Sequence, residues 1–162
     1  MKIMTRLLLS ACLVLPLAAC QQEEETQQVE RAPVAAPQTD DRNEWRAYLN
    51  DAVGRNMEGI FNQPFVYLLP ADGGSEESAG EYERLAERAE TDLARGIIRG
   101  NLLAYAGHNS NRVADMAVNA FEKVPEGSMN GVRVLFIGDA VDNPRVEQAV
   151  TPAGVEYVFI EK

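Results

Sequence analysis

The side chains best suited to catalysis are a histidine, a serine and an aspartate that follow two apolar segments. His108 is the single histidine of the chain, and Ser110 follows it within "AGHNSN". Asp139 comes directly after the apolar segment 132–138. A histidine between a carboxylate and a hydroxyl can act as the general base that activates a serine nucleophile. His108, Asp139 and Ser110, with Ser75 as the alternative nucleophile, are the catalytic candidates of a hydrolase-like site.

The local motifs favour a structural interpretation of the same segment. Hydrolases of the α/β type place their serine in a G-x-S-x-G turn, whereas Ser110 stands three positions after Gly107. The segment also matches neither the dinucleotide-binding glycine pattern nor the phosphate-binding loop with its lysine. Asn109, Ser110 and Asn111 are residue types that cap the start of a helix. We therefore interpret this segment first as a helix N-terminus and second as a site.

Two aspartates, one of them the catalytic candidate Asp139, could supply oxygen ligands to a divalent cation. Asp139 and Asp142 lie within "GDAVDNP", but no third ligand stands at a matching spacing. An aspartate before Asn-Pro is typical of a helix entrance, where its charge complements the helix dipole. The sequence therefore predicts neither a metal site nor a cofactor.

Short apolar segments alternate with amphipathic ones, and this alternation must position the candidates. Strands are predicted at 64–70, 101–107, 132–138 and 155–162, which are short, apolar and rich in β-branched or aromatic residues. The first predicted helix covers 42–58, with Asp41 as its N-cap. The second begins at the capping box Ser78-x-x-Glu81 and ends at Gly96, and the third begins within 108–111 and ends at Phe121. The fourth has Asn143 as N-cap and Pro144 as its first helical residue.

Strands separated by helices indicate an α/β fold with a mostly parallel sheet. We expect a small three-layer sandwich of Rossmann or flavodoxin type, preceded by one N-terminal helix, with four strands in the order 2-1-3-4. Ligands of such sheets bind beyond the carboxyl ends of the strands. The loops there would bring together one rim of polar residues: Asp72, Ser75, His108, Asn109, Ser110, Asp139 and Asp142.

The charge of the chain disfavours several classes of partner. The formal net charge is −10, and the segment from Asp41 onward has 20 acidic and 12 basic residues, a charge of −8. Such a field repels nucleic acid and anionic headgroups, so we expect no nucleic-acid binding. A basic periplasmic protein or a cationic ligand would fit this charge. For a basic protein, the candidate contact residues are Glu81, Glu83, Glu87 and Glu90.

The N-terminus has the pattern of a secretory signal peptide. Lys2 and Arg6 precede the apolar segment Leu7–Leu17, which is too short for a transmembrane helix of about 20 residues. The following Leu17-Ala18-Ala19-Cys20 resembles the lipobox of bacterial lipoproteins at every position. The resemblance covers residues 1–20 and implies cleavage before Cys20, diacylglycerol on its sulfur and acylation of its amino group. By the same resemblance, Gln21 implies the outer membrane, facing the periplasm.

This resemblance divides the chain into three parts. Residues 1–19 are the expected signal peptide, 20–40 the lipidated cysteine with a disordered tether, and 41–162 a single domain. Cys12 would leave with the signal peptide and Cys20 would carry lipid, so the mature domain would contain no free thiol and no disulfide.

Three functional hypotheses follow. The first is an anchored envelope lipoprotein whose domain has a non-enzymatic binding, accessory or inhibitor-like role. The second is a small hydrolase-like or ligand-binding enzyme that uses the rim around His108. The third is a structural component that bridges layers of the envelope.

Overall fold

The computed structural model describes residues 32–69, 71 and 74–162, which form a three-layer α/β/α domain. Its elements follow the chain in the order α1 (Arg42–Arg55), β1 (Phe65–Leu68), α2 (Glu76–Arg95), β2 (Leu102–Ala106), α3 (Ser110–Phe121), β3 (Arg133–Gly138), α4 (Asn143–Val150), a short 3₁₀ turn (Thr151–Ala153) and β4 (Glu156–Glu161). All strand pairs are parallel, so the predicted fold class is confirmed.

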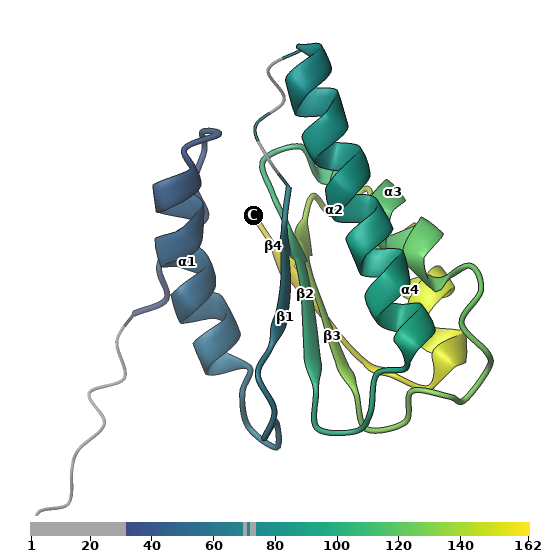
Figure 1. Ribbon diagram of the computed structural model, residues 1–162. Coiled ribbons are helices and arrows are strands. Elements are labelled where there is room, and N and C mark those ends of the chain that lie inside the picture. The colour runs from purple at the N-terminus through teal and green to yellow at the C-terminus, as the bar shows by residue number, and fades with distance from the viewer. Residues whose placement is uncertain (1–31, 70, 72–73) are drawn as a thin grey trace, which may run out of the picture. The chain divides into compact units, whose positions relative to one another are not determined.

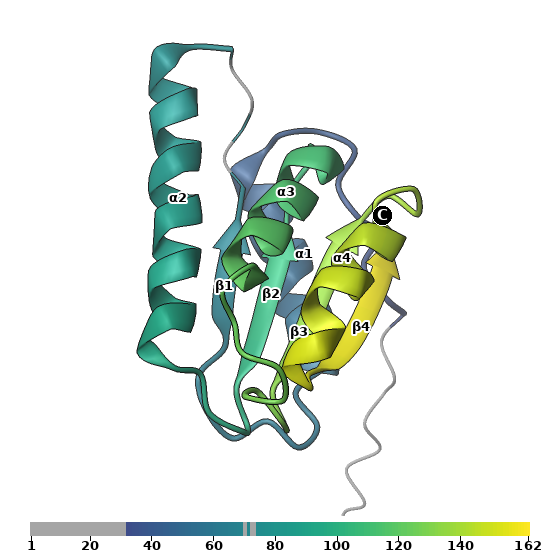
Figure 2. The same cartoon turned by 90° about the vertical axis from the view of Figure 1, so that its right-hand side faces the viewer.

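The strand order is β1-β2-β3-β4, and the expected order 2-1-3-4 is wrong. Each new strand is added on the same side of the previous one. Because parallel crossovers are right-handed, crossovers in one direction place their helices on one face of the sheet. Figures 1 and 2 show α2, α3 and α4 on that face and α1 on the other. The order never reverses, so the sheet has no switch point of the kind that forms a ligand crevice in doubly wound folds.

Helix α1 is the one described helix that packs on the second face of the sheet. Asp41 caps it, because its Oδ1 accepts hydrogen bonds from the backbone N–H groups of Asn43 and Glu44. Trp45, Leu49 and Val53 recur on one side of the helix and are buried against the sheet. On that face of the sheet the inward residues alternate along the strands: Leu102, Ala104, Ala106, Leu135 and Ile137.

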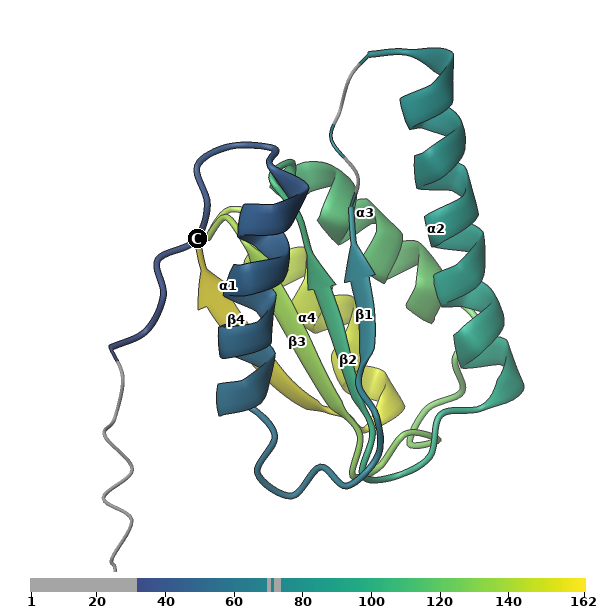
Figure 3. The same ribbon diagram turned by 60° about the vertical axis from the view of Figure 1, so that its left-hand side comes forward.

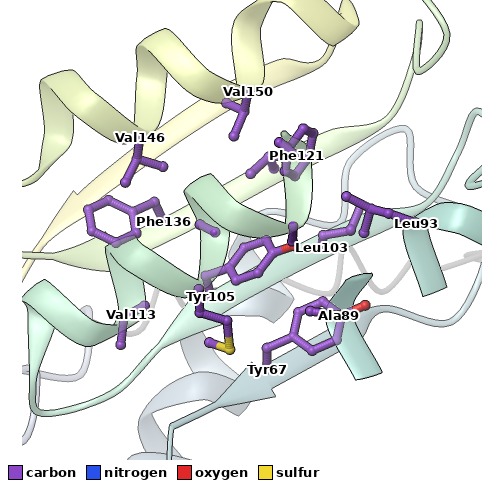
Figure 4. Close-up of a cluster of buried hydrophobic side chains, with 14 of the residues drawn as sticks. Tyr67, Ala89, Leu93, Leu103, Tyr105, Val113, Phe121, Phe136, Val146 and Val150 are labelled. Atoms are coloured by element: carbon purple, nitrogen blue, oxygen red, sulfur yellow. The ribbon is translucent and has the colours of Figure 1, made fainter. Parts of the chain in front are cut away.

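The larger part of the core lies between the sheet and α2–α4 (Figure 4). Tyr67 and Tyr105 are fully buried there, with their rings stacked 4.9 Å apart. The Tyr67 hydroxyl lies 3.1 Å from Asp92 Oδ2, to which it donates, whereas the Tyr105 hydroxyl has no hydrogen-bond partner among the described residues. Burial raises the pKa of both tyrosines, and the charge of Asp92 adds to the effect.

Two helix starts differ from the sequence-based expectation. Helix α2 begins at Glu76, and its capping box joins Ser75 and Ser78 in place of Ser78 and Glu81. The hydroxyl of Ser78 reaches back to the Ser75 backbone, so serine takes the role predicted for glutamate. Helix α4 begins at Asn143, one residue earlier than predicted, and Asp142 at its N-cap makes no capping bond because Ser110 and Arg145 hold its carboxylate.

Residues 32–40, predicted as part of the tether, lie along α1 without regular secondary structure. The backbone N–H of Val34 donates to Asp51 Oδ2, and the Trp45 indole donates to the carbonyl of Thr39. The expected signal peptide, Cys20 and the rest of the tether lie outside the described residues. Among the described helices, none is long and apolar enough to cross a bilayer.

Candidate functional site

The predicted rim exists as a small recess beyond the carboxyl ends of β2 and β3. It encloses about 420 Å³ and brings together five of the seven predicted residues, His108, Asn109, Ser110, Asp139 and Asp142, with Asn111 and Val141 beside them. Ser75 is an exposed cap of α2 outside this recess, and Asp72 lies outside the described residues. The parallel topology therefore gathers the candidates as expected, but their contacts determine what they can do.

Ser110 is held in place by two hydrogen bonds at this recess. Its hydroxyl is buried, donates to Asp142 Oδ2 at 2.7 Å and accepts from the backbone N–H of Asp139 at 2.7 Å. Gly138 gives the hydroxyl room, because a Cβ there would lie 2.6 Å from Ser110 Oγ. A serine nucleophile needs a base for its proton and access to a substrate. The contacts of Ser110 join the starts of α3 and α4.

Asp142 and Arg145 extend this network across α3 and α4. Asp142 Oδ1 accepts from the guanidinium of Arg145, which also binds Asp115 and the carbonyl of Asn111. Burial alone would lower the pKa of Arg145, but its hydrogen bonds to Asp115 and Asp142 outweigh burial and raise it. The buried carboxylate is thus paired, as its location requires.

His108 is exposed and takes no part in this network. Asp139 Oδ1 lies 3.0 Å from the Lys162 ammonium, and no hydrogen bond between described residues joins His108 to Asp139 or Ser110. The structure thus collects the three candidates without linking them as nucleophile, base and orienting carboxylate. Within the described part of the chain, no group of three or more potential metal ligands comes together.

A larger recess, which the sequence analysis missed, lies along the open edge of β1. It is a groove of about 860 Å³ between α1 and α2, and we call it the edge groove. Figures 1 and 3 show β1 at the edge of the sheet, between the two helices. The groove is lined from α1 to α2 by Arg42, Arg46, Leu49, Asn50, Val53, Gly54, Met57, Gln63, Pro64, Val66, Leu68, Glu81, Arg84, Leu85 and Arg88.

Four arginines face one carboxylate in this groove. Arg42 pairs with Glu81 at 3.4 Å across the groove, and Arg88 lies 3.6 Å from Asp92. Arg46 and Arg84 are exposed and have no carboxylate partner among the described residues. The groove is therefore a cationic surface on a domain whose formal charge from Asp41 onward is −8.

The spacing of these arginines was a signal that the sequence contained. Arg42 and Arg46 stand four residues apart on one helix, as do Arg84 and Arg88 on another, so each pair shares a helix face. The sequence does not reveal that the two faces meet. The predicted acidic surface of α2 is also divided, because Glu81 lies in the groove while Glu83, Glu87 and Glu90 are exposed.

Comparison with known proteins adds no relative to this description: the chain matches no protein-family model, and no curated protein or solved structure is significantly similar to it.

Proposed function

We propose that the chain is a lipoprotein of the bacterial cell envelope, anchored through lipid on Cys20, whose domain binds a partner without catalysis. The edge groove is the observation that carries the binding role, because it is open, about 860 Å³ in volume, and combines an apolar floor with charged groups. Binding sites of proteins commonly have this size and this composition. Support for the anchor is the Leu17-Ala18-Ala19-Cys20 pattern.

The groups at the rim support a structural role better than a catalytic one. The buried Ser110 hydroxyl is committed to Asp142 and to the Asp139 backbone, and Asp139 faces Lys162. A hydrolase at this rim would require His108 to contact a serine hydroxyl. The alternative enzyme therefore predicts a turnover that His108→Ala abolishes, whereas a binding module predicts an unchanged phenotype for this variant.

The exposed face of α2 supports a second partner, the basic periplasmic protein that the charge of the chain favours. Glu83, Glu87 and Glu90 are exposed on this helix, outside the edge groove. Converting the three glutamates to glutamine would weaken the binding of a basic partner that docks on them, and would leave the binding of a ligand in the edge groove unchanged.

Mass spectrometry of the chain from its native host tests the anchor. We expect an N-terminal peptide that begins at Cys20 and carries diacylglycerol on sulfur and an acyl chain on nitrogen. Cys20→Ser should abolish both modifications, while Cys12→Ser, the matched control, should leave the mature protein unchanged. An unmodified, uncleaved N-terminus would overturn the assignment.

Cross-linking in envelope extracts tests the binding role. The full chain is compared with Arg46→Glu/Arg84→Glu in the edge groove and with the glutamine variant of the α2 face. A cross-linked partner that either variant loses supports a binding module at that surface. Partners that both variants retain in full would exclude both surfaces, and with them the proposed role.

A further inference from the structure

We propose that the edge groove binds an extended acidic peptide segment, which pairs with β1 as a fifth strand and places its carboxylates against the arginines of α1 and α2. This inference deepens the proposed binding role, on which it rests, by naming the chemistry of the partner.

The outer edge of β1 has backbone groups available for pairing. The N–H of Leu69 donates to the carbonyl of Ala106 at 2.8 Å, in continuation of the β1–β2 ladder. In a strand, alternate residues turn their backbone groups to opposite edges, so Val66 and Leu68 present theirs on the side away from β2. Two N–H donors and two carbonyl acceptors therefore face the edge groove. An exposed edge of this kind is a template for an added strand.

The two flanking helices leave this edge accessible instead of covering it. Val66 is 37% exposed at the edge, and the groove beside it encloses about 860 Å³. Four residues of an added strand would run alongside β1, a length of about 13 Å. Because side chains alternate along a strand, such a segment would turn one row toward α1 and the other toward α2.

Charge complementarity identifies the segment as acidic. An added strand would find Arg42 and Arg46 on one side and Arg84 and Arg88 on the other, so both rows of its side chains meet guanidinium groups. Arginine binds carboxylates through charge-assisted hydrogen bonds. The contact between Arg42 and Glu81 is an internal example, at 3.4 Å and with both side chains at least 40% exposed. An exposed pair of this kind contributes little stability, so an incoming carboxylate can replace Glu81.

The groove is polarised along its length. Its charged end lies at the carboxyl end of β1, where the first turn of α1 meets the N-terminal part of α2 through Arg42 and Glu81. Its other end has no charged lining residue and contains Met57, which follows α1, and Gln63 and Pro64, which precede β1. The segment that fits has acidic residues at one end and apolar residues at the other. A fatty acid shares this amphipathic pattern, but it has no N–H or carbonyl groups to pair with Val66 and Leu68.

Fluorescence anisotropy with synthetic peptides tests the proposal on the purified full chain. The probes are two labelled hexapeptides, three glutamates followed by three valines and the reverse order, so that both strand directions are sampled. We expect at least one to bind, and its counterpart with lysine in place of glutamate to bind at least about tenfold more weakly. N-methylation of alternate residues in the acidic peptide removes the donors for pairing and should weaken binding by about tenfold or more.

Variants of the protein locate the binding site. Arg46→Glu/Arg84→Glu should lower the affinity for the acidic peptide by about tenfold or more, because two guanidinium groups are replaced by carboxylates. Arg55→Glu/Arg95→Glu changes the net charge equally on the same two helices, outside the groove, and should retain most of the affinity. Hydrogen exchange provides the direct readout: the amides of Val66 and Leu68 should be protected about tenfold or more when the peptide is bound.

Three results would overturn the proposal. One is equal binding of the acidic and lysine peptides, and another is equal binding of the N-methylated and unmodified peptides. The third is displacement of the peptide by laurate, with laurate bound in the groove and the Val66 and Leu68 amides unprotected, which would identify an apolar anion as the natural occupant. Failure here is distinguishable from failure of the proposed function: a cross-linked partner lost in Arg46→Glu/Arg84→Glu would still establish the groove as a binding surface.

Discussion

Replacing Tyr105 by phenylalanine is expected to stabilise the domain at neutral pH. The Tyr105 side chain is fully buried, and its hydroxyl has no hydrogen-bond partner among the described residues. A buried polar group without a partner costs about 1–3 kcal/mol of desolvation. Phenylalanine retains the ring, and therefore the stacking on Tyr67 at 4.9 Å. We expect the free energy of unfolding to rise by about 1 kcal/mol, the lower end of that range.

The same substitution should reduce the sensitivity of the fold to alkali. Burial raises the pKa of both Tyr67 and Tyr105 above the ordinary value near 10. Their contribution to stability is complete below about pH 10 and is lost as the pH rises above it, because the unfolded chain releases these protons first. At pH 11 this loss of stability is on the order of 1 kcal/mol for each tyrosine. Tyr105→Phe removes one of these two losses, so its free-energy advantage over the parent should grow to about 2 kcal/mol.

Urea unfolding at pH 7 and at pH 11, followed by circular dichroism, measures both effects. Tyr67→Phe is the matched control, because it removes a hydroxyl that does have a partner, Asp92 at 3.1 Å. Relative to the parent, the free energy of unfolding of this control should be lower by about 1 kcal/mol at pH 7, and the deficit should be offset by a similar amount at pH 11. A lower urea midpoint for Tyr105→Phe at pH 7 would refute the reasoning, since it would mean that the hydroxyl is hydrogen-bonded, for instance to a buried water molecule.

Two further substitutions test contacts between distant elements. Ser110→Ala leaves the buried Asp142 carboxylate without its hydroxyl donor, so thermal unfolding should show a free energy of unfolding lower by about 1–3 kcal/mol. The control His108→Ala should change the midpoint little, and an unchanged midpoint in Ser110→Ala would contradict the structural role of this serine. Arg133 donates to the carbonyls of Asn56 and Glu58, at 2.5 and 3.0 Å, and to both carboxylate oxygens of Glu156 at 2.8 Å. Arg133→Met should therefore cost about 2 kcal/mol in the same assay. A loss no larger than that of Glu156→Gln would show that the contacts to the carbonyls of Asn56 and Glu58, at the end of α1 and in the loop after it, contribute nothing.

Local signals in the sequence determined the elements and their class. The apolar segments became β1–β4, and Asp41 and Asn109 cap their helices as their residue types predict. Alternation of strands and helices was enough to predict a parallel sheet covered on both faces. These properties follow from residue spacing and backbone chemistry within a few turns of the chain, so they can be read without knowledge of distant contacts.

The order of the strands was decided by tertiary structure alone. A right-handed crossover can add a strand on either side of the previous one, and the two choices have similar local patterns. The choice made here places three helices on one face and leaves β1 at an open edge between α1 and α2. The same choice removes the switch point that would have made the rim a crevice.

At both candidate sites, the rim and the edge groove, contacts between elements far apart in the sequence decided what the side chains do. The sequence brought His108, Ser110 and Asp139 to one rim, but the partners of Ser110, 29 and 32 residues away along the chain, gave its hydroxyl a structural role. The arginine pairs of α1 and α2 were visible at helical spacing, yet Arg42 and Glu81 are 39 residues apart and meet only across the edge of β1. Residue spacing fixes which side chains share a helix face, whereas the packing of distant elements decides what that face meets.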